Sequence, residues 1–182
     1  MRIAALQFVV WSTAVALSIP VALAQSESDH RAAITLARGG GTTIIEGGTG
    51  KAGGFLPVET TIAFHSERTS GGGIAGDFEC FARAPEAANG SGSGQFTVNV
   101  MYVTGQIKTA VISGETATLS GTADITGLGA GTNVPFTLVV RRGGPGATAE
   151  LTTNGASELL FHEILLQGKF EVFSGRHEDR YP

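Results

Sequence analysis

The chain has 182 residues, of which 42% are hydrophobic and 27 are glycine, and its formal net charge is −4. This length is typical of one domain, and the glycines lie between short apolar runs, as in a protein of strands and turns. The mild acidity argues against nucleic acid or an anionic membrane surface as a partner.

The first 24 residues have the pattern of a secretory signal peptide. Arg2 precedes an almost wholly apolar run from Ile3 to Leu23, and Ala22-Leu23-Ala24 matches a small-residue cleavage site. We expect an exported protein, secreted or periplasmic, with no stable membrane insertion; the alternative is an uncleaved N-terminal anchor. Cleavage leaves eleven Lys and Arg against sixteen Asp and Glu, a net charge of −5. Residues 25–32 then form a polar N-terminal segment.

The front half of the mature chain predicts strands separated by glycine-rich turns. Gly71-Gly72-Gly73 is expected to join the last two of these strands in a hairpin. Residues 47–54 are expected to be a flexible connection, and Pro85 to Gly94 a surface loop, in which Asn89-Gly90-Ser91 matches a glycosylation acceptor. The expected strands are 34–37, 42–46, 60–67 and 74–84.

The second half predicts a meander of further strands. Phe96, Val98 and Val100 alternate with polar residues, which is the pattern of a half-buried strand. Gly121 suggests a bulge, and Pro135 suggests an edge strand or a strand opening. Turns are expected at Gly105, 113–115, 127–131, 142–146 and 154–155. The expected strands are 95–103, 106–113, 116–126, 134–140, 149–153, 159–166 and 168–173, and the tail 174–182 is expected to be disordered.

These elements predict an all-β domain over residues 33–173. We expect a single antiparallel β-barrel of eight to ten strands, and a two-sheet β-sandwich is the alternative. If the sheet stays open, its edges favour a homo-oligomer. The lone cysteine, Cys80, permits no internal disulfide and is expected to be a small buried hydrophobe.

Five stretches together resemble the post-COAP-1 type of bacterial exported β domain. They are Gly94-Gln95-Phe96-Thr97-Val98-Asn99-Val100, Ala117–Ala123, Pro135–Val140, Gly144-Pro145-Gly146 and Gly168–Val172. The family typically shows a glycine-led phenylalanine strand, a small-residue strand, a Gly-Pro-Gly-like turn and a closing strand. The resemblance implies the β fold and no catalytic residue, and Ala147-Thr148-Ala149 stands where the family usually has an acidic residue. A more distant likeness to allene oxide cyclase and dirigent barrels is architectural only.

Known chemical motifs are not matched. Gly47-Gly48-Thr49-Gly50-Lys51-Ala52 departs from a phosphate loop, because Ile45 and Ala52 replace required residues and no helix is expected to follow. His162-Glu163 has no second histidine four residues after the first. We therefore predict no cofactor and no metal site.

Six ionisable residues remain as site candidates: His65, Glu67, Asp77, Glu79, His162 and Glu163. The predicted hairpin carries four of them. His65 and Glu67 lie on one face of its first strand, and Asp77 and Glu79 lie on one face of its second strand. If that face points to water, as is usual opposite an apolar face, these residues are solvated. If it lines a cavity, they can perform acid–base chemistry. No catalytic residue is assigned among them.

The leading functional hypothesis is a non-catalytic exported module, binding or structural. The alternative is a small β-barrel enzyme, cyclase-like or isomerase-like, acting on an apolar small molecule. The two hypotheses differ in whether the barrel interior is filled by side chains or holds a roomy cavity. Polysaccharide binding is disfavoured, because only two tyrosines and no tryptophan remain after cleavage.

Overall fold

The computed structural model describes residues 33–46, 57–89 and 94–174. These residues form eight strands and one short 3-10 helix, η1 (Glu86–Asn89). None of their helices is long and apolar enough to cross a membrane. The strands are β1 (Ile34–Ile45), β2 (Glu59–Arg68), β3 (Ile74–Ala84), β4 (Val98–Ser113), β5 (Thr116–Gly127), β6 (Gly131–Arg141), β7 (Thr148–Asn154) and β8 (Glu158–Val172).

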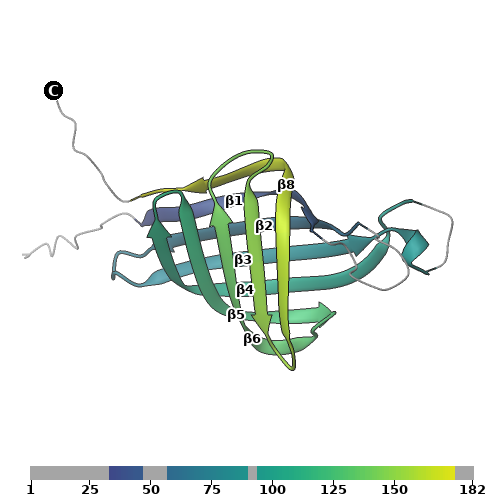
Figure 1. The fold of residues 1–182 in the computed structure, drawn as a ribbon. Helices are drawn as coiled ribbons and strands as arrows, with labels where there is room; N and C mark the ends of the chain where they lie inside the picture. The colour runs from purple at the N-terminus through teal and green to yellow at the C-terminus, as the bar shows by residue number, and fades with distance from the viewer. Residues whose placement is uncertain (1–32, 47–56, 90–93, 175–182) are drawn as a thin grey trace, which may run out of the picture. The chain divides into compact units, whose positions relative to one another are not determined.

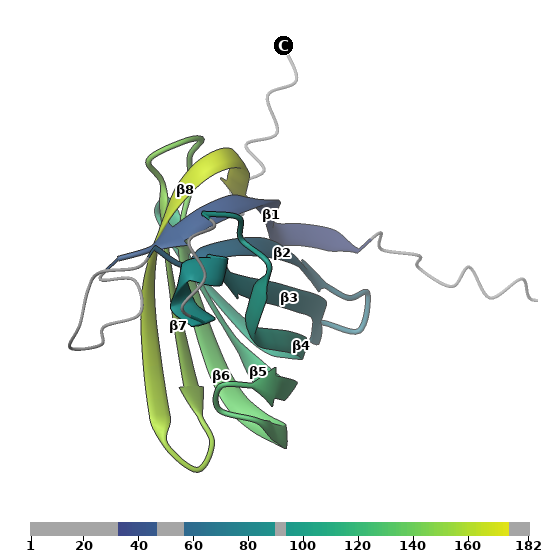
Figure 2. The same ribbon diagram turned by 90° about the vertical axis from the view of Figure 1, so that its right-hand side faces the viewer.

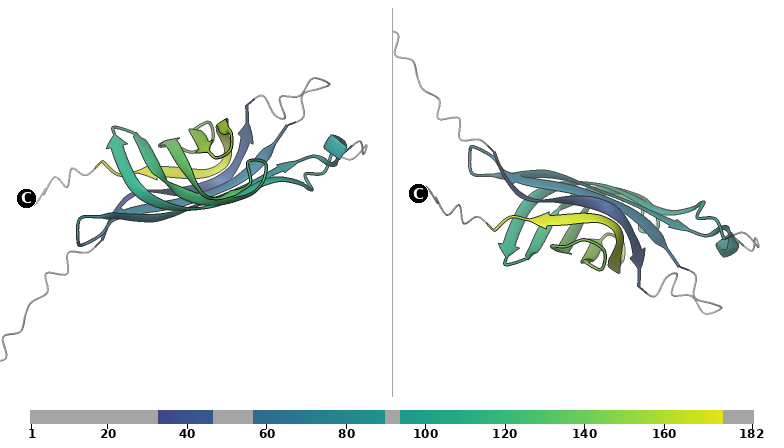
Figure 3. Two further views of the ribbon diagram at one scale, coloured as in Figure 1. Left: turned by 90° about the horizontal axis from the view of Figure 1, so that it is seen from below. Right: turned by 90° about the horizontal axis from the view of Figure 1, so that it is seen from above.

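The eight strands pair in chain order into one closed antiparallel barrel (Figure 1). Pairing of β1 with β8, from Ala37↔Val172 to Ile45↔Glu163, closes the sheet, and Figure 3 shows these two strands side by side. The predicted all-β antiparallel barrel is therefore confirmed, with eight strands. Closure of the described strands also removes the open sheet on which self-association through edges would depend.

Strand β8 changes partners along its length. Its first half pairs with β7, from Asn154↔Glu158 to Thr148↔Ile164, and its second half pairs with β1. Figure 2 shows the β7–β8 and β5–β6 hairpins extending in the same direction, away from β1–β4. Glu163 lies at the changeover, where it faces Ala149 on one side and Ile45 on the other.

Five predicted reversals are confirmed, at residues 71–73, 113–115, 127–131, 142–146 and 154–155. The hairpin around Gly71–Gly73 joins β2 to β3 in an unbroken register from Glu59↔Arg83 to Arg68↔Ile74. The reversal at residues 113–115 joins β4 to β5, with Gly114 at a φ of 58°, a region that glycine enters at no steric cost.

Three predicted strand breaks are wrong, because glycines lie inside continuous strands. β1 runs through Gly39–Gly41, β4 through Gly105 and β8 through Gly168. A Cβ atom at Gly105 would lie 2.8 Å from the ring of Phe136, and one at Gly168, whose φ is 118°, would overlap a carbonyl oxygen of β1. These glycines allow a neighbouring ring or backbone to come close, so they mark contacts and not chain reversals.

The bulge and proline predictions need partial correction. The register irregularity predicted at Gly121 is present, but the inserted residue, Lys108, lies opposite it on β4. Pro135 lies inside β6, where it pairs with Thr122 of β5. The β6–β7 register begins only at Phe136, so the missing N–H of the proline costs no ladder bond on that side.

Several predictions concern residues outside the described ranges. These are the signal peptide (1–24), the polar segment (25–32), the connection at 47–54 and the tail apart from Ser174. Within the predicted loop from Pro85 to Gly94, η1 is an element that the sequence did not suggest.

Apolar side chains fill the barrel interior. Phe78 stacks on Phe136 with ring centroids 5.2 Å apart, and Phe64 packs on Phe170 at 5.5 Å. All four rings belong to one continuous buried cluster. Cys80 belongs to it as well, with 3% of its surface exposed, which confirms that it is a small buried hydrophobe.

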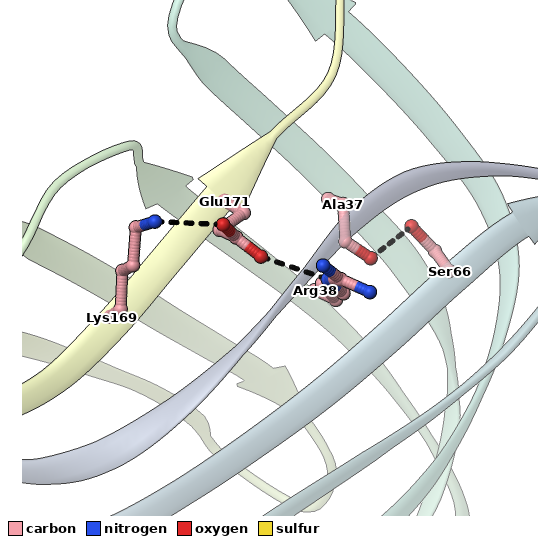
Figure 4. A network of polar contacts seen from close by, with 5 residues as sticks. All are labelled: Ala37, Arg38, Ser66, Lys169 and Glu171. Carbon is pink, nitrogen blue, oxygen red and sulfur yellow. Dashed lines mark hydrogen bonds and ion pairs between the residues drawn. The ribbon is translucent and has the colours of Figure 1, made fainter.

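The closing seam between β1 and β8 carries polar contacts on the outer wall (Figure 4). Glu171 on β8 accepts hydrogen bonds from Arg38 and Lys169, each at 2.8 Å. These two cations lower the pKa of Glu171 to about 2. On the inner side, the hydroxyl of Ser66 donates to the carbonyl of Ala37 at 3.3 Å. The pair of strands that closes the barrel is thus linked by side chains as well as by its ladder.

Candidate functional site

The hairpin residues predicted from sequence lie on the outer wall. His65, Asp77 and Glu79 are exposed and Glu67 is half-buried. His65 faces Asp77 in the β2–β3 register. Asp77, however, accepts a hydrogen bond from Gln106 Nε2 at 2.7 Å, and His65 Nε2 lies 4.0 Å from Glu67 Oε2. The solvated alternative therefore describes these residues, and they do not form a cavity.

His162 has a closer acidic partner. Its Nδ1 atom lies 3.1 Å from Glu150 Oε2 on the neighbouring strand, because the β7–β8 register places Glu150 opposite His162. Both side chains are about half exposed, on the outer wall. A carboxylate at Nδ1 orients the imidazole and leaves Nε2 directed elsewhere.

These two residues line a pocket of about 250 Å³ on the outer wall, which we call the outer pocket. Its outward-facing side chains form two rows across β6, β7 and β8. Glu46, the residue directly after β1, also lines the pocket. Buried Ala149 and Glu163 lie between the rows. The lining residues are Glu46, Val139, Arg141, Thr148, Ala149, Glu150, His162, Glu163 and Ile164.

The pocket combines an apolar floor with opposite charges. Val139 and Ile164 are half-buried and contribute aliphatic surface. Arg141 and Glu46 are exposed, and neither side chain forms an ion pair or hydrogen bond with another described residue. Polar groups of both signs above an apolar floor can orient a small ligand.

Directly behind His162, Glu163 points into the barrel. Only 2% of its surface is exposed, which is rare for a glutamate without a charged partner. Its partners are two buried threonines, Thr43 on β1 and Thr60 on β2, which face each other in the register. Thr60 Oγ1 lies 2.5 Å from Glu163 Oε2, and Thr43 Oγ1 also bonds to that oxygen.

These three side chains form a closed ring of contacts. Thr43 and Thr60 contact each other through their hydroxyl oxygens, and both contact Glu163 Oε2. Both hydroxyls donate to this one carboxyl oxygen, and no described cation pairs with Glu163. Burial raises the pKa of Glu163 and so favours the protonated acid, although the threonine hydrogen bonds lower the pKa in part.

Cys80 is an unsuitable nucleophile in this setting. Burial raises the pKa of its thiol well above the usual value, and the charge that Glu163 acquires on ionising raises it further. A protonated thiol inside an apolar core is unreactive. Among the described residues, no group of three His, Cys, Asp or Glu side chains is placed to hold a metal ion.

Sequence reasoning named His162 and Glu163 but missed their partners. Glu150 and Arg141 reach the outer pocket through strand register, which the sequence pattern does not reveal. Thr43 and Thr60 look like ordinary strand residues, since threonine is common in sheets. The available signal was the apolar setting of Glu163, because a buried acid requires hydrogen-bonding partners.

No family model, no curated protein and no solved structure matches the chain.

Proposed function

We propose that this protein is an exported, non-catalytic barrel module that binds a small ligand in the outer pocket. The observation that carries the proposal is the pocket itself, which Arg141 and Glu46 line together with Val139 and Ile164. Neither charged side chain has an ion-pair partner among the described residues. Export rests on the N-terminal sequence pattern. The likeness to post-COAP-1 domains agrees with such a module and contributes no site residue.

The arrangement of the interior supports a non-catalytic role. Phenylalanine rings occupy the barrel, and Glu163, the buried acid, uses its carboxyl group in the ring with Thr43 and Thr60. A general acid or base must reach a substrate proton directly or through one water. Glu163 instead uses its carboxyl group in structural contacts with Thr43 and Thr60.

A pocket-filling substitution tests this function. We expect Thr148→Trp, at the pocket lining, to abolish binding of whichever compounds bind the mature protein in a ligand-observed NMR screen of amino acids, dipeptides, organic acids, sugars and nucleosides. Thr152→Trp, on the same face of β7 but outside the pocket, is the matched control. Absence of any binder, or binding that survives Thr148→Trp, would refute the proposal.

The Glu150–His162 contact favours one second candidate, a small barrel enzyme. A carboxylate 3.1 Å from Nδ1 holds the imidazole as an oriented base at the pocket surface. Four outward-facing ionisable side chains line the pocket, in addition to buried Glu163, so a polar substrate suits it better than the apolar one expected from sequence. Turnover of a bound compound, followed by NMR and lost in His162→Gln while binding persists, would establish this alternative.

A further inference from the structure

We propose that the outer pocket selects a zwitterion, namely an amino acid or dipeptide with both ends free. Its carboxylate binds Arg141 and its ammonium group binds Glu46. This assignment rests on the proposed binding function and narrows it to one ligand class. It follows from the placement of two opposite charges on two sides of one pocket.

The strand order separates the two charges. Arg141 lies on β6 and Glu46 follows β1, with β7 and β8 between them. At a spacing of ~4.8 Å per strand, three strand spacings separate the two backbones by about 14 Å across the sheet. The backbone amide of Glu46 donates to the carbonyl of His162 at 2.8 Å, which fixes Glu46 at the β8 side of the pocket.

Two other arginines of the outer wall have a carboxylate partner on a neighbouring strand. Arg38 and Arg83 each lie 2.8 Å from a carboxylate on an adjacent strand. Arg141 and Glu46 line the same small pocket and yet form no ion pair with each other or with any other described side chain. A ligand that carries both charges supplies a partner to each. A ligand with one charge would satisfy one residue and leave the other without a partner.

The chemistry of the lining agrees with this ligand class. A guanidinium binds a carboxylate through two parallel hydrogen bonds, and a glutamate accepts bonds from an ammonium group. The volume of about 250 Å³ corresponds to roughly eight waters at ~30 Å³ each, which suits an amino acid or dipeptide better than a longer peptide. Val139 and Ile164 offer apolar contact to an aliphatic side chain, so leucine-like residues should be preferred.

Glycyl-leucine and its capped forms provide the test. By isothermal titration of the mature protein, we expect glycyl-leucine to bind, and N-acetylation or C-terminal amidation each to weaken binding about two- to fivefold, as for one partly exposed charge contact. In Arg141→Gln, amidation of the dipeptide should no longer weaken binding, whereas acetylation should still weaken it. Glu46→Gln should show the opposite pattern.

Arg142→Gln and Glu79→Gln are the matched controls, because both residues are exposed and lie outside the pocket lining. Equal affinity for free and capped dipeptides, or an Arg142→Gln effect as large as that of Arg141→Gln, would overturn the ligand class. If glycyl-leucine fails to bind while another screened compound binds and is blocked by Thr148→Trp, the zwitterion is wrong and the binding function stands. If no compound binds, both proposals fail.

Discussion

The hydroxyl of Thr60 lies 2.5 Å from the carboxyl oxygen of Glu163, a residue 103 positions further along the chain. These residues belong to β2 and β8, which do not pair with each other but flank β1 on its two sides. Together with Thr43 on β1, they form a polar link across the strands where the sheet closes. Burial of a protonated carboxyl group costs far less free energy than burial of a carboxylate.

The stability of the barrel should fall as the pH rises above the ordinary range of a carboxyl group. Glu163 has a raised pKa in the folded state, so its contribution is fully present below the unfolded value of about 4.5 and is lost as the pH rises through the folded pKa. Urea unfolding at a series of pH values should show this decline in the wild type. Glu163→Gln, which cannot ionise, should remove the decline; a stability that rises over this interval would contradict the raised pKa of Glu163.

The ring should tolerate an amide but not a truncation. Glu163→Gln preserves both a donor and an acceptor and should cost less than about 1 kcal/mol in the free energy of unfolding. Glu163→Ala removes packing and leaves buried hydroxyls short of partners, so we expect a loss of about 2 kcal/mol or more. Glu79→Ala, on the exposed wall, should change stability by less than about 0.5 kcal/mol. Equal losses in the Gln and Ala variants would argue against the ring.

The fold was largely predictable because its signals are local. Alternation at Phe96, Val98 and Val100 and the glycines at Gly71–Gly73 identify strands and reversals without reference to the rest of the chain. Closure of the sheet into a barrel was harder to predict, because it depends on the pairing of β1 with β8, whose residues are more than a hundred positions apart in the chain. Alternation alone fits a barrel and a sandwich equally well.

The site was less predictable, because it depends on register between strands. The sequence predicted that His65 and Asp77 lie on the two arms of one hairpin, but only the structure shows that they face each other and that this face is the outer wall. The approach of Glu150 to His162 requires the β7–β8 register, and the approach of Thr60 to Glu163 requires closure of the sheet.

Glu171 should titrate well below an ordinary glutamate. Hydrogen bonds from Lys169 and Arg38 lower its pKa to about 2, so these contacts stabilise the closing seam above pH 4.5 and are lost as the pH falls through about 2. Side-chain NMR titration should give this low value, and the value should rise toward the ordinary one in Arg38→Gln. Because solvent reaches the carboxylate on the outer wall, the gain in stability should be small and should diminish with added salt. An unshifted titration curve would contradict the network.

Gly105→Ala should destabilise the barrel, although alanine usually suits a strand at least as well as glycine. A Cβ atom at this position would lie 2.8 Å from Phe136 and 3.3 Å from Phe78, within the stacked pair of rings. Overpacking of this kind costs about 1–3 kcal/mol, measurable by urea unfolding. Gly94→Ala, where a Cβ meets no atom within 4 Å, should be close to neutral.

A second substitution separates the ring contact from any general effect of the added methyl group. Phe136→Leu removes the two closest atoms that a Cβ at position 105 would meet, so the free-energy cost of Gly105→Ala should be smaller in that background. In double-mutant cycles, residues in direct contact show coupling energies of about 0.5–3 kcal/mol. If the two changes are additive, the glycine is needed for some reason other than the approach of Phe136.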